Sequence, residues 1–206
     1  MTGNKSTRTL VWDLPTRVFH WLMVICFAIA YFTASDDRLA MIHATAGFTI
    51  LGLLLFRLLW GFAGSRYARF SSFVQGPRKI IHYLRCLCFG KIQHCTGHNP
   101  AGGVAILLIL ILGLAVTISG ALLYEEIDWP MLEEIHETST DLMLAVIAMH
   151  VIGVIVSSFL HKENLPRAMI TGFKFGCQEQ GIEQSHRLIG LIILAATFGF
   201  WFVFLE

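Results

Sequence analysis

Long uncharged stretches separated by short polar segments dominate the chain. Each uncharged stretch is about as long as the ~20 residues that a helix needs to cross the hydrocarbon core of a bilayer. The stretches are residues 18–35, 39–56, 101–124, 142–160 and 188–205. This pattern predicts an all-α integral membrane protein, because helices satisfy their backbone groups within lipid. The predicted helices are approximately 16–35, 39–60, 101–124, 137–161 and 186–205.

Residues 77–91 mix apolar and basic side chains, a composition typical of a helix that lies on the inner membrane surface. A solvated loop is the alternative. The predicted segments follow one another without a recognisable repeat or long linker, so residues 1–206 are expected to form a single membrane domain.

The charged residues are distributed unevenly between the two predicted sides. Of the 15 Lys and Arg residues, all except Arg38 fall on one side, the side of the N-terminus. Lys and Arg are enriched in the cytoplasmic loops of membrane proteins. The distribution therefore predicts a cytoplasmic N-terminus and a periplasmic C-terminus. The formal net charge of only +1 gives no reason to expect nucleic-acid binding.

Four histidines within the apolar spans are the strongest candidates for chemistry. His136 and His150 are fourteen residues apart on one predicted helix, so they share a face and lie about 21 Å apart along its axis. His43 enters the membrane from the same side as His136, and His20 is nearest in depth to His150. Two pairs follow, His43/His136 and His20/His150, and each pair joins two helices.

Two imidazoles at one depth are the axial ligands that a haem needs. Zinc or non-haem iron would require further carboxylate or thiolate ligands at that depth. The alternative is that the four histidines are buried side chains bonded to neighbouring helices or water. No C-x-x-C-H motif is present, so the haem would be bound non-covalently.

Further side chains fit this chemistry less specifically. Arg57 shares a helix face with His43 near the inner boundary, where it would bind a haem propionate; a plain positive-inside anchor explains it equally well. His161 and His186, at inner helix ends, could flank a quinone or be ordinary interfacial residues. The segment from His94 to His98, which includes Cys95, has metal-like residue types but no fourth ligand.

Several motifs together resemble the bacterial di-haem cytochrome b-561 family, which includes the cytochrome b subunit of nickel–iron hydrogenases. The resemblance covers nearly the whole chain. The motifs are Val11-Trp12-Asp13-Leu14-Pro15-Thr16-Arg17-Val18-Phe19-His20-Trp21, Ile42-His43-Ala44-x-x-Gly47 with Arg57, His98-Asn99-Pro100-Ala101-Gly102-Gly103, and His136-Glu137-Thr138 with His150. The resemblance implies two non-covalent b haems on the iron ligands His20, His43, His136 and His150, in a four-helix core with a C-terminal fifth helix.

The function implied by the resemblance is transmembrane electron transfer in the bacterial inner membrane. It would link the quinone pool of a respiratory chain to a periplasmic partner, such as a c-type cytochrome or a hydrogenase-like subunit. Quinone oxidoreductase activity and a homo-oligomeric state stay open, and no residue is assigned as catalytic. One alternative is a superoxide-oxidising quinone reductase, which the acidic outer surface disfavours. A non-redox proton channel or transporter is the other.

Overall fold

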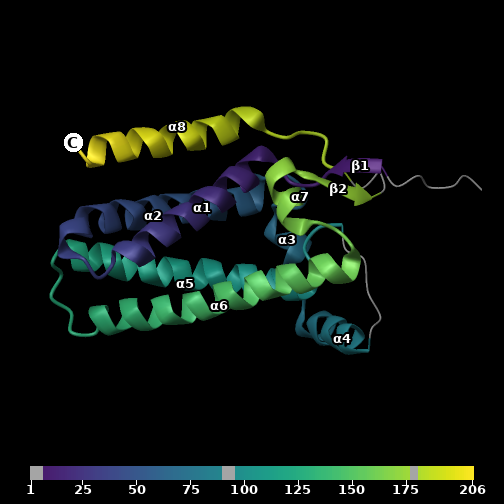
Figure 1. The fold of residues 1–206 in the computed structure, drawn as a ribbon, viewed down its shortest axis with the longest axis horizontal. Coiled ribbons are helices and arrows are strands. Elements are labelled where there is room, and N and C mark those ends of the chain that lie inside the picture. Colours follow the sequence, from purple (N-terminus) through teal and green to yellow (C-terminus); the bar gives the residue numbers. More distant parts are fainter. Residues whose placement is uncertain (1–6, 90–95, 177–180) are drawn as a thin grey trace, which may run out of the picture.

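The computed structural model describes residues 7–89, 96–176 and 181–206, which are mostly helical. Five of the helices are long and apolar enough to cross a membrane. They are α1 (Leu14–Thr33), α2 (Ala40–Ala63), α5 (Pro100–Tyr124), α6 (Leu132–His161) and α8 (Arg187–Phe204). They run side by side in one bundle (Figure 1). The predicted all-α membrane fold with five spanning helices is confirmed.

The helices pack in chain order except at α8. The helix α1 packs against α2, α2 also packs against α5, and α5 packs against α6. The C-terminal α8 returns to the start of the bundle and lies along α1 and α2. The indole N–H of Trp201 in α8 donates to the Thr49 hydroxyl of α2 over 2.9 Å. The buried core is correspondingly concentrated in α1, α2 and α5, around side chains such as Ile50, Leu54 and Leu110.

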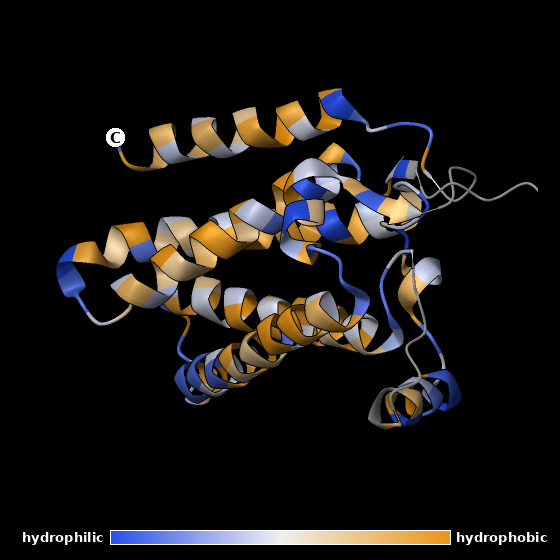
Figure 2. Cartoon of the chain, turned by 45° about the vertical axis from the view of Figure 1, so that its right-hand side comes forward, coloured by the Kyte–Doolittle hydropathy of each residue, from blue (hydrophilic) through white to orange (hydrophobic). Residues whose placement is uncertain are grey.

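The outward faces of the helices are apolar and lack protein neighbours. In α6, Met149 is 71% exposed and Phe159 is 80% exposed. Figure 2 shows hydrophobic residues along the length of the bundle and hydrophilic ones gathered towards its two ends. Such faces suit contact with lipid chains, which are as apolar as the side chains themselves.

The helix α6 begins at Leu132, earlier than the predicted 137. Its first turn therefore includes Glu133 and Glu134, whose carboxylates are favoured beside the positive end of the helix dipole. At the same end of the bundle, the short 3₁₀ helix η1 (Asp37–Leu39) joins α1 to α2. Here Arg38 donates side-chain hydrogen bonds to Asp36 and lowers the pKa of that carboxyl.

Short elements collect at the opposite, basic end. They are α3 (Phe70–Phe73), α4 (Pro77–Cys88) and α7 (Leu165–Thr171). The helix α4 covers most of the predicted 77–91 segment and projects from the side of the bundle (Figure 1). Its apolar and basic residues occupy opposite faces, which favours placement on a membrane surface. That placement stays a prediction.

A two-stranded antiparallel sheet at the basic end is not anticipated by the sequence analysis. Strand β1 (Thr7–Leu10) pairs with β2 (Phe173–Gly176), with Arg8 opposite Phe175. The backbone N–H groups of Val11 and Trp12 extend this contact to the Gly172 carbonyl. Gly172 ends α7 with a φ of 87°, and a Cβ there would lie 2.8 Å from the Trp12 carbonyl oxygen. Four residues are the lower limit for a period-two pattern, and Thr7–Leu10 does not show one.

Asp13 connects the N-terminal segment to the bundle. It is fully buried, and its Oδ1 accepts the Thr16 N–H at 2.8 Å as the N-cap of α1. Its Oδ2 accepts the indole N–H of Trp60 in α2 at 3.0 Å. One carboxylate therefore caps α1 and fixes α1 against α2.

We expect Asp13→Ala to lower the free energy of unfolding by about 2–4 kcal/mol. The change removes a helix cap worth about 1 kcal/mol and leaves a buried indole N–H without an acceptor, at about 1–3 kcal/mol. Denaturant unfolding in detergent, followed by circular dichroism, measures the loss. Asp36→Ala is the control, because Asp36 caps only the exposed η1. Equal losses in the two variants would contradict the role of Asp13.

Candidate functional site

The structure brings two of the predicted histidines together near the acidic end. His43 lies in the first turn of α2 and His136 lies near the start of α6. Their ring centres are 6.3 Å apart and their planes are inclined by 66°. The pair joins two helices that pack mainly against other neighbours, since α6 packs chiefly against α5 and α2 against α1 and α5.

Both rings are oriented by the backbone. His43 Nδ1 lies 2.8 Å from the Ala30 carbonyl oxygen of α1, and His136 Nδ1 lies 2.9 Å from the Val116 carbonyl oxygen of α5. A carbonyl oxygen can only accept a hydrogen bond, so in each ring Nδ1 carries the proton. The lone pair of Nε2 is then available to a metal. Metal-binding histidines typically have this arrangement, which fixes the tautomer and the ring direction.

The ring separation is compatible with one metal ion between the two imidazoles. Two metal–imidazole bonds of about 2.0–2.1 Å each, together with the distance from each nitrogen to its ring centre, give about 6 Å. No group of three or more His, Cys, Asp or Glu side chains that could hold a bare metal ion is found in the described part of the chain. Two ligands suffice for an iron that a porphyrin already coordinates. The residues present therefore fit haem.

Glycines lie near three of the four predicted iron ligands, and they differ in how much space surrounds them. A Cβ at Gly120 would lie 2.8 Å from Cε1 of His136, so this glycine in α5 makes room for the ring. A Cβ at Gly47, one turn from His43, or at Gly153, beside His150, would meet nothing within 4 Å. Open space on these helix surfaces is compatible with a flat cofactor lying against them.

The second predicted pair lies deeper towards the basic end. His20 of α1 and His150 of α6 are electrostatic neighbours. The ring of His20 lies edge-on to Trp21, with centres 5.1 Å apart. Its Nδ1 is buried and makes no hydrogen bond with the described residues. Among the described residues, neither ring of this pair has a hydrogen bond to a backbone carbonyl like those that orient the outer pair.

Arg57 is buried, with only 3% of its surface exposed, so it is not an anchor extending into water. Its guanidinium carbon lies 5.2 Å from the ring centre of Phe70 and 5.7 Å from that of Phe73. One guanidinium nitrogen, NH1, is buried without a hydrogen-bond partner among the described residues. A cation in this state fits an anionic group at the basic end, such as a carboxylate.

His98, which the sequence places in the possible metal motif and in one family motif, joins the inner group. Its ring packs between Trp12 and Phe73, with centres 4.5 and 5.0 Å away. Its Nδ1 is buried without a partner in the described structure, although the ring as a whole is half-buried. Desolvation, followed by the positive charge of Arg57, lowers the pKa of His98 to about 3, so the ring is neutral at pH 7. The sequence feature that could have indicated this role is the position of His98 directly before Asn99, the N-cap residue of α5.

The other histidines singled out from the sequence also lie at the basic end. His186 directly precedes α8 at its N-cap position and packs edge-on to Trp60, with ring centres 5.2 Å apart. His161 ends α6 and lines a small cavity of about 40 Å³ with Asn99 and Lys174. His94 and Cys95, part of the possible metal motif, lie outside the described residues.

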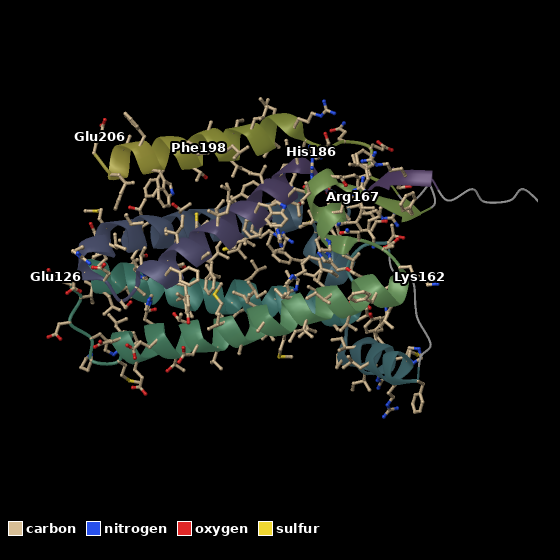
Figure 3. The ribbon with its side chains drawn as sticks, in the orientation of Figure 1. Glu126, Lys162, Arg167, His186, Phe198 and Glu206 are labelled. Atoms are coloured by element: carbon tan, nitrogen blue, oxygen red, sulfur yellow. The ribbon has the colours of Figure 1, made fainter. Side chains whose placement is uncertain are left out.

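The acidic end carries an exposed cluster directly beyond the outer pair. Its seven carboxylates, together called the acidic cap, are Glu125, Glu126, Asp128, Glu133, Glu134, Glu137 and Asp141. Apolar side chains are interspersed with them, and Ile127, Trp129 and Met131 are each at least half exposed. Figure 3 shows Glu126 at the end of the bundle opposite Lys162 and Arg167.

Comparison with known proteins identifies a family of membrane cytochromes. The model of one family, described as prokaryotic cytochrome b561, matches residues 11–172. The "Probable Ni/Fe-hydrogenase 1 B-type cytochrome subunit" of Escherichia coli (strain K12) is 28% identical over 141 residues, which cover 56% of this chain and 60% of that protein. The alignment thus spans less than two thirds of the Escherichia coli relative.

Two further relatives have similar names. The "Probable Ni/Fe-hydrogenase B-type cytochrome subunit" of Bradyrhizobium diazoefficiens is 22% identical over 207 residues, covering 79% of this chain and 84% of that protein. The protein of the same name from Rhodobacter capsulatus is 26% identical over 149 residues, covering 59% and 57%. No solved structure matches the chain.

We expect Gly120→Ala to displace the His136 ring, because the added Cβ would lie within 3 Å of it. Loss of about half of the bound haem should follow, and absorbance of the purified protein, normalised to protein, measures it. Gly199→Ala in α8 is the matched control, since a Cβ there meets nothing within 4 Å. Full haem content in Gly120→Ala would show that the ring tolerates the displacement.

Proposed function

This chain belongs to the prokaryotic cytochrome b561 family, and we propose that it transfers electrons across a membrane through two non-covalently bound b haems. The observation that carries the proposal is the outer pair. His43 and His136 face each other at 6.3 Å, with both Nδ1 atoms bonded to backbone carbonyls. Such rings present Nε2 to one iron. His20 and His150 would hold the second haem, and residues 1–206 would act as one membrane domain.

The ligand set supports electron relay as the function. A bound haem would supply an iron that accepts and releases one electron. His43 and His136 would supply both protein ligands of the iron, so the protein would leave no open position for oxygen or a substrate. Any chemistry on a substrate would then occur at a quinone site or on a partner protein.

Arg57 and His98 would hold the propionates of the inner haem. Both have a buried nitrogen without a hydrogen-bond partner, and both lie beside the aromatic ring of Phe73. The Arg57 guanidinium would bind one carboxylate through two parallel hydrogen bonds. A neutral His98 has one N–H to donate and adds no repulsion towards Arg57.

The likeness to hydrogenase cytochrome subunits supports a redox partner at the acidic end. In the proposed orientation the N-terminus is cytoplasmic, and the C-terminus and the acidic cap are periplasmic, in a bacterial inner membrane. A periplasmic c-type cytochrome or hydrogenase-like subunit would dock on the acidic cap. Quinone would exchange electrons near the inner pair, where His161 and His186 lie at helix ends.

Ligand replacement tests the pairing directly. His43→Ala and His136→Ala should each remove the same haem, while His20→Ala and His150→Ala should each remove the other. The spectrum and redox titration of each purified variant identify the haem that remains. His82→Ala, on the exposed face of α4, should retain both. Loss of one common haem from His43→Ala and His150→Ala would refute the pairing, and a wild type without haem would refute the function.

Arg57→Gln should lower the reduction potential of the inner haem. A positive charge stabilises the reduced form, so its removal should shift the potential by about 60 mV, a tenfold change in a one-electron equilibrium. Arg57→Lys should retain part of the effect, and the exposed Arg66→Gln should have none. If a redox titration finds both potentials unchanged in Arg57→Gln, the propionate contact is wrong.

Replacing Glu125, Glu126, Glu133 and Glu134 with Lys should slow electron exchange with a basic periplasmic partner. Attraction between opposite charges speeds association and weakens with salt over ~8–10 Å. The association rate measured by stopped flow should therefore be lower than that of the wild type and should depend less on ionic strength. Both haem spectra should be intact. Asp36→Lys with Asp37→Lys reverses charges outside the acidic cap and serves as control. An unchanged rate at low salt would exclude this docking surface.

A further inference from the structure

A second cavity, distinct from the histidine pairs, lies at the basic end of the bundle. It has a volume of about 200 Å³, and it is formed by β1, the end of α6, α7 and β2. Four basic side chains line it, accompanied by a single acid. We call this cavity the basic pocket. Its lining includes Arg8, Lys162, Glu163, Arg167, Lys174 and Phe175. Figure 3 shows Lys162 at the end of α6 and Arg167 on the neighbouring α7.

The acid is already neutralised. Glu163 pairs with Lys174 over 3.3 Å, and both side chains are largely buried, with 12% and 7% of their surfaces exposed. Within residues 7–89, 96–176 and 181–206, the other three cations make no ion pair. Arg8 instead lies over the ring of Phe173, with its guanidinium carbon 4.5 Å from the ring centre. The basic pocket therefore has an excess of three positive charges.

Topology alone does not explain this arrangement. Basic residues are expected on one side of a membrane protein, but nothing in that rule brings them to one cavity. Arg8 arrives here only because β1 pairs with β2, across more than 160 residues of sequence. Three cations that repel one another at one cavity are stabilised by an anion between them. Guanidinium groups in particular match the oxygens of a phosphate.

The depth of the basic pocket identifies the source of that anion. Lys162 directly follows His161, the last residue of the spanning helix α6, so the pocket lies where the chain leaves the hydrocarbon. The rim is apolar, since Phe175 is 66% exposed and Phe173 is 37% exposed. The volume equals that of about seven waters at ~30 Å³ each, which admits a phosphate and part of a glycerol. Basic pockets at this depth bind anionic lipid headgroups.

We propose that the basic pocket binds the phosphate group of an anionic phospholipid, with Arg8 and Arg167 as its principal ligands. Lys162 contributes charge at the rim, and the Glu163–Lys174 pair forms the floor. The site lies at the basic end whichever side of the membrane that end faces, so it is independent of haem binding and of orientation. The bound headgroup ties β1, α6 and α7 together.

Native mass spectrometry of the full-length protein, delipidated in a neutral detergent, tests the proposal. Limiting phosphatidylglycerol or phosphatidylcholine is added, and the first lipid adduct is counted. The wild type should bind phosphatidylglycerol at least about tenfold more tightly than phosphatidylcholine, and Arg8→Gln with Arg167→Gln should abolish that preference. The control, Arg66→Gln with Arg78→Gln, removes two exposed cations from the same end and should retain the preference.

Three results would overturn the proposal. They are an undiminished preference in the Arg8/Arg167 variant, an equal loss in the control, and thermal stabilisation by inorganic phosphate that matches that by phosphatidylglycerol. The last would identify a site for soluble phosphate. Arg167→Gln alone leaves β1 unchanged and should weaken phosphatidylglycerol binding severalfold. This single variant tests the proposal if the double variant misfolds. Haem spectra recorded on the same samples separate this outcome from any failure of the haem sites.

Discussion

An imidazole within a membrane-spanning bundle must find partners for both of its ring nitrogens, and this requirement governs the arrangement of the outer site. Water is absent from the hydrocarbon region, so an unsatisfied polar atom there is costly. For Nδ1 of both His43 and His136 the protein supplies a backbone carbonyl on a neighbouring helix, and the Ser119 hydroxyl also lies 3.3 Å from Nδ1 of His136. The other nitrogen of each ring, Nε2, is then available to bind a metal. The helix positions, the ring tautomers and the proposed iron site thus depend on one another.

The same requirement explains the different character of the inner site. Here the buried nitrogens of His20, Arg57 and His98 have no hydrogen-bond partners among the described residues. Three such groups at one depth carry a high desolvation cost unless something satisfies them. A cofactor with two carboxylates would satisfy Arg57 and His98 in a single binding event, and its iron would bind the ring of His20. The inner site is therefore expected to depend on its haem more strongly than the outer one.

The two ends of the bundle are specialised by charge. At one end the acidic cap surrounds exposed apolar side chains, including Trp129, as in a surface that docks a soluble partner. At the other end, β1, α4 and α7 surround a net positive region. The basic pocket is built from segments that also close the inner site, since Lys174 is an electrostatic neighbour of His98. Lipid binding and the inner site therefore share a structural support, although they use different residues.

The sequence by itself determined the membrane fold and much of the candidate site. Uncharged stretches of bilayer length indicate five helices, because lipid leaves the backbone few alternatives. The helical period and the alternating direction of successive helices were enough to match His43 with His136 in depth. Arg57 could be named for the same reason, but its burial could not, since a basic residue near a membrane boundary is ordinarily exposed.

Only the tertiary structure decided how the chain closes at its basic end. The pairing of β1 with β2 joins short segments far apart in the sequence, and four residues carry too little pattern to reveal it. That pairing brings Arg8 to the basic pocket, and the fold of the loop before α5 brings His98 to Arg57. Helix formation and membrane insertion depend on local composition, so both can be predicted from a single stretch of sequence. A contact between distant segments depends on how the whole bundle packs, and no stretch of this sequence records that by itself.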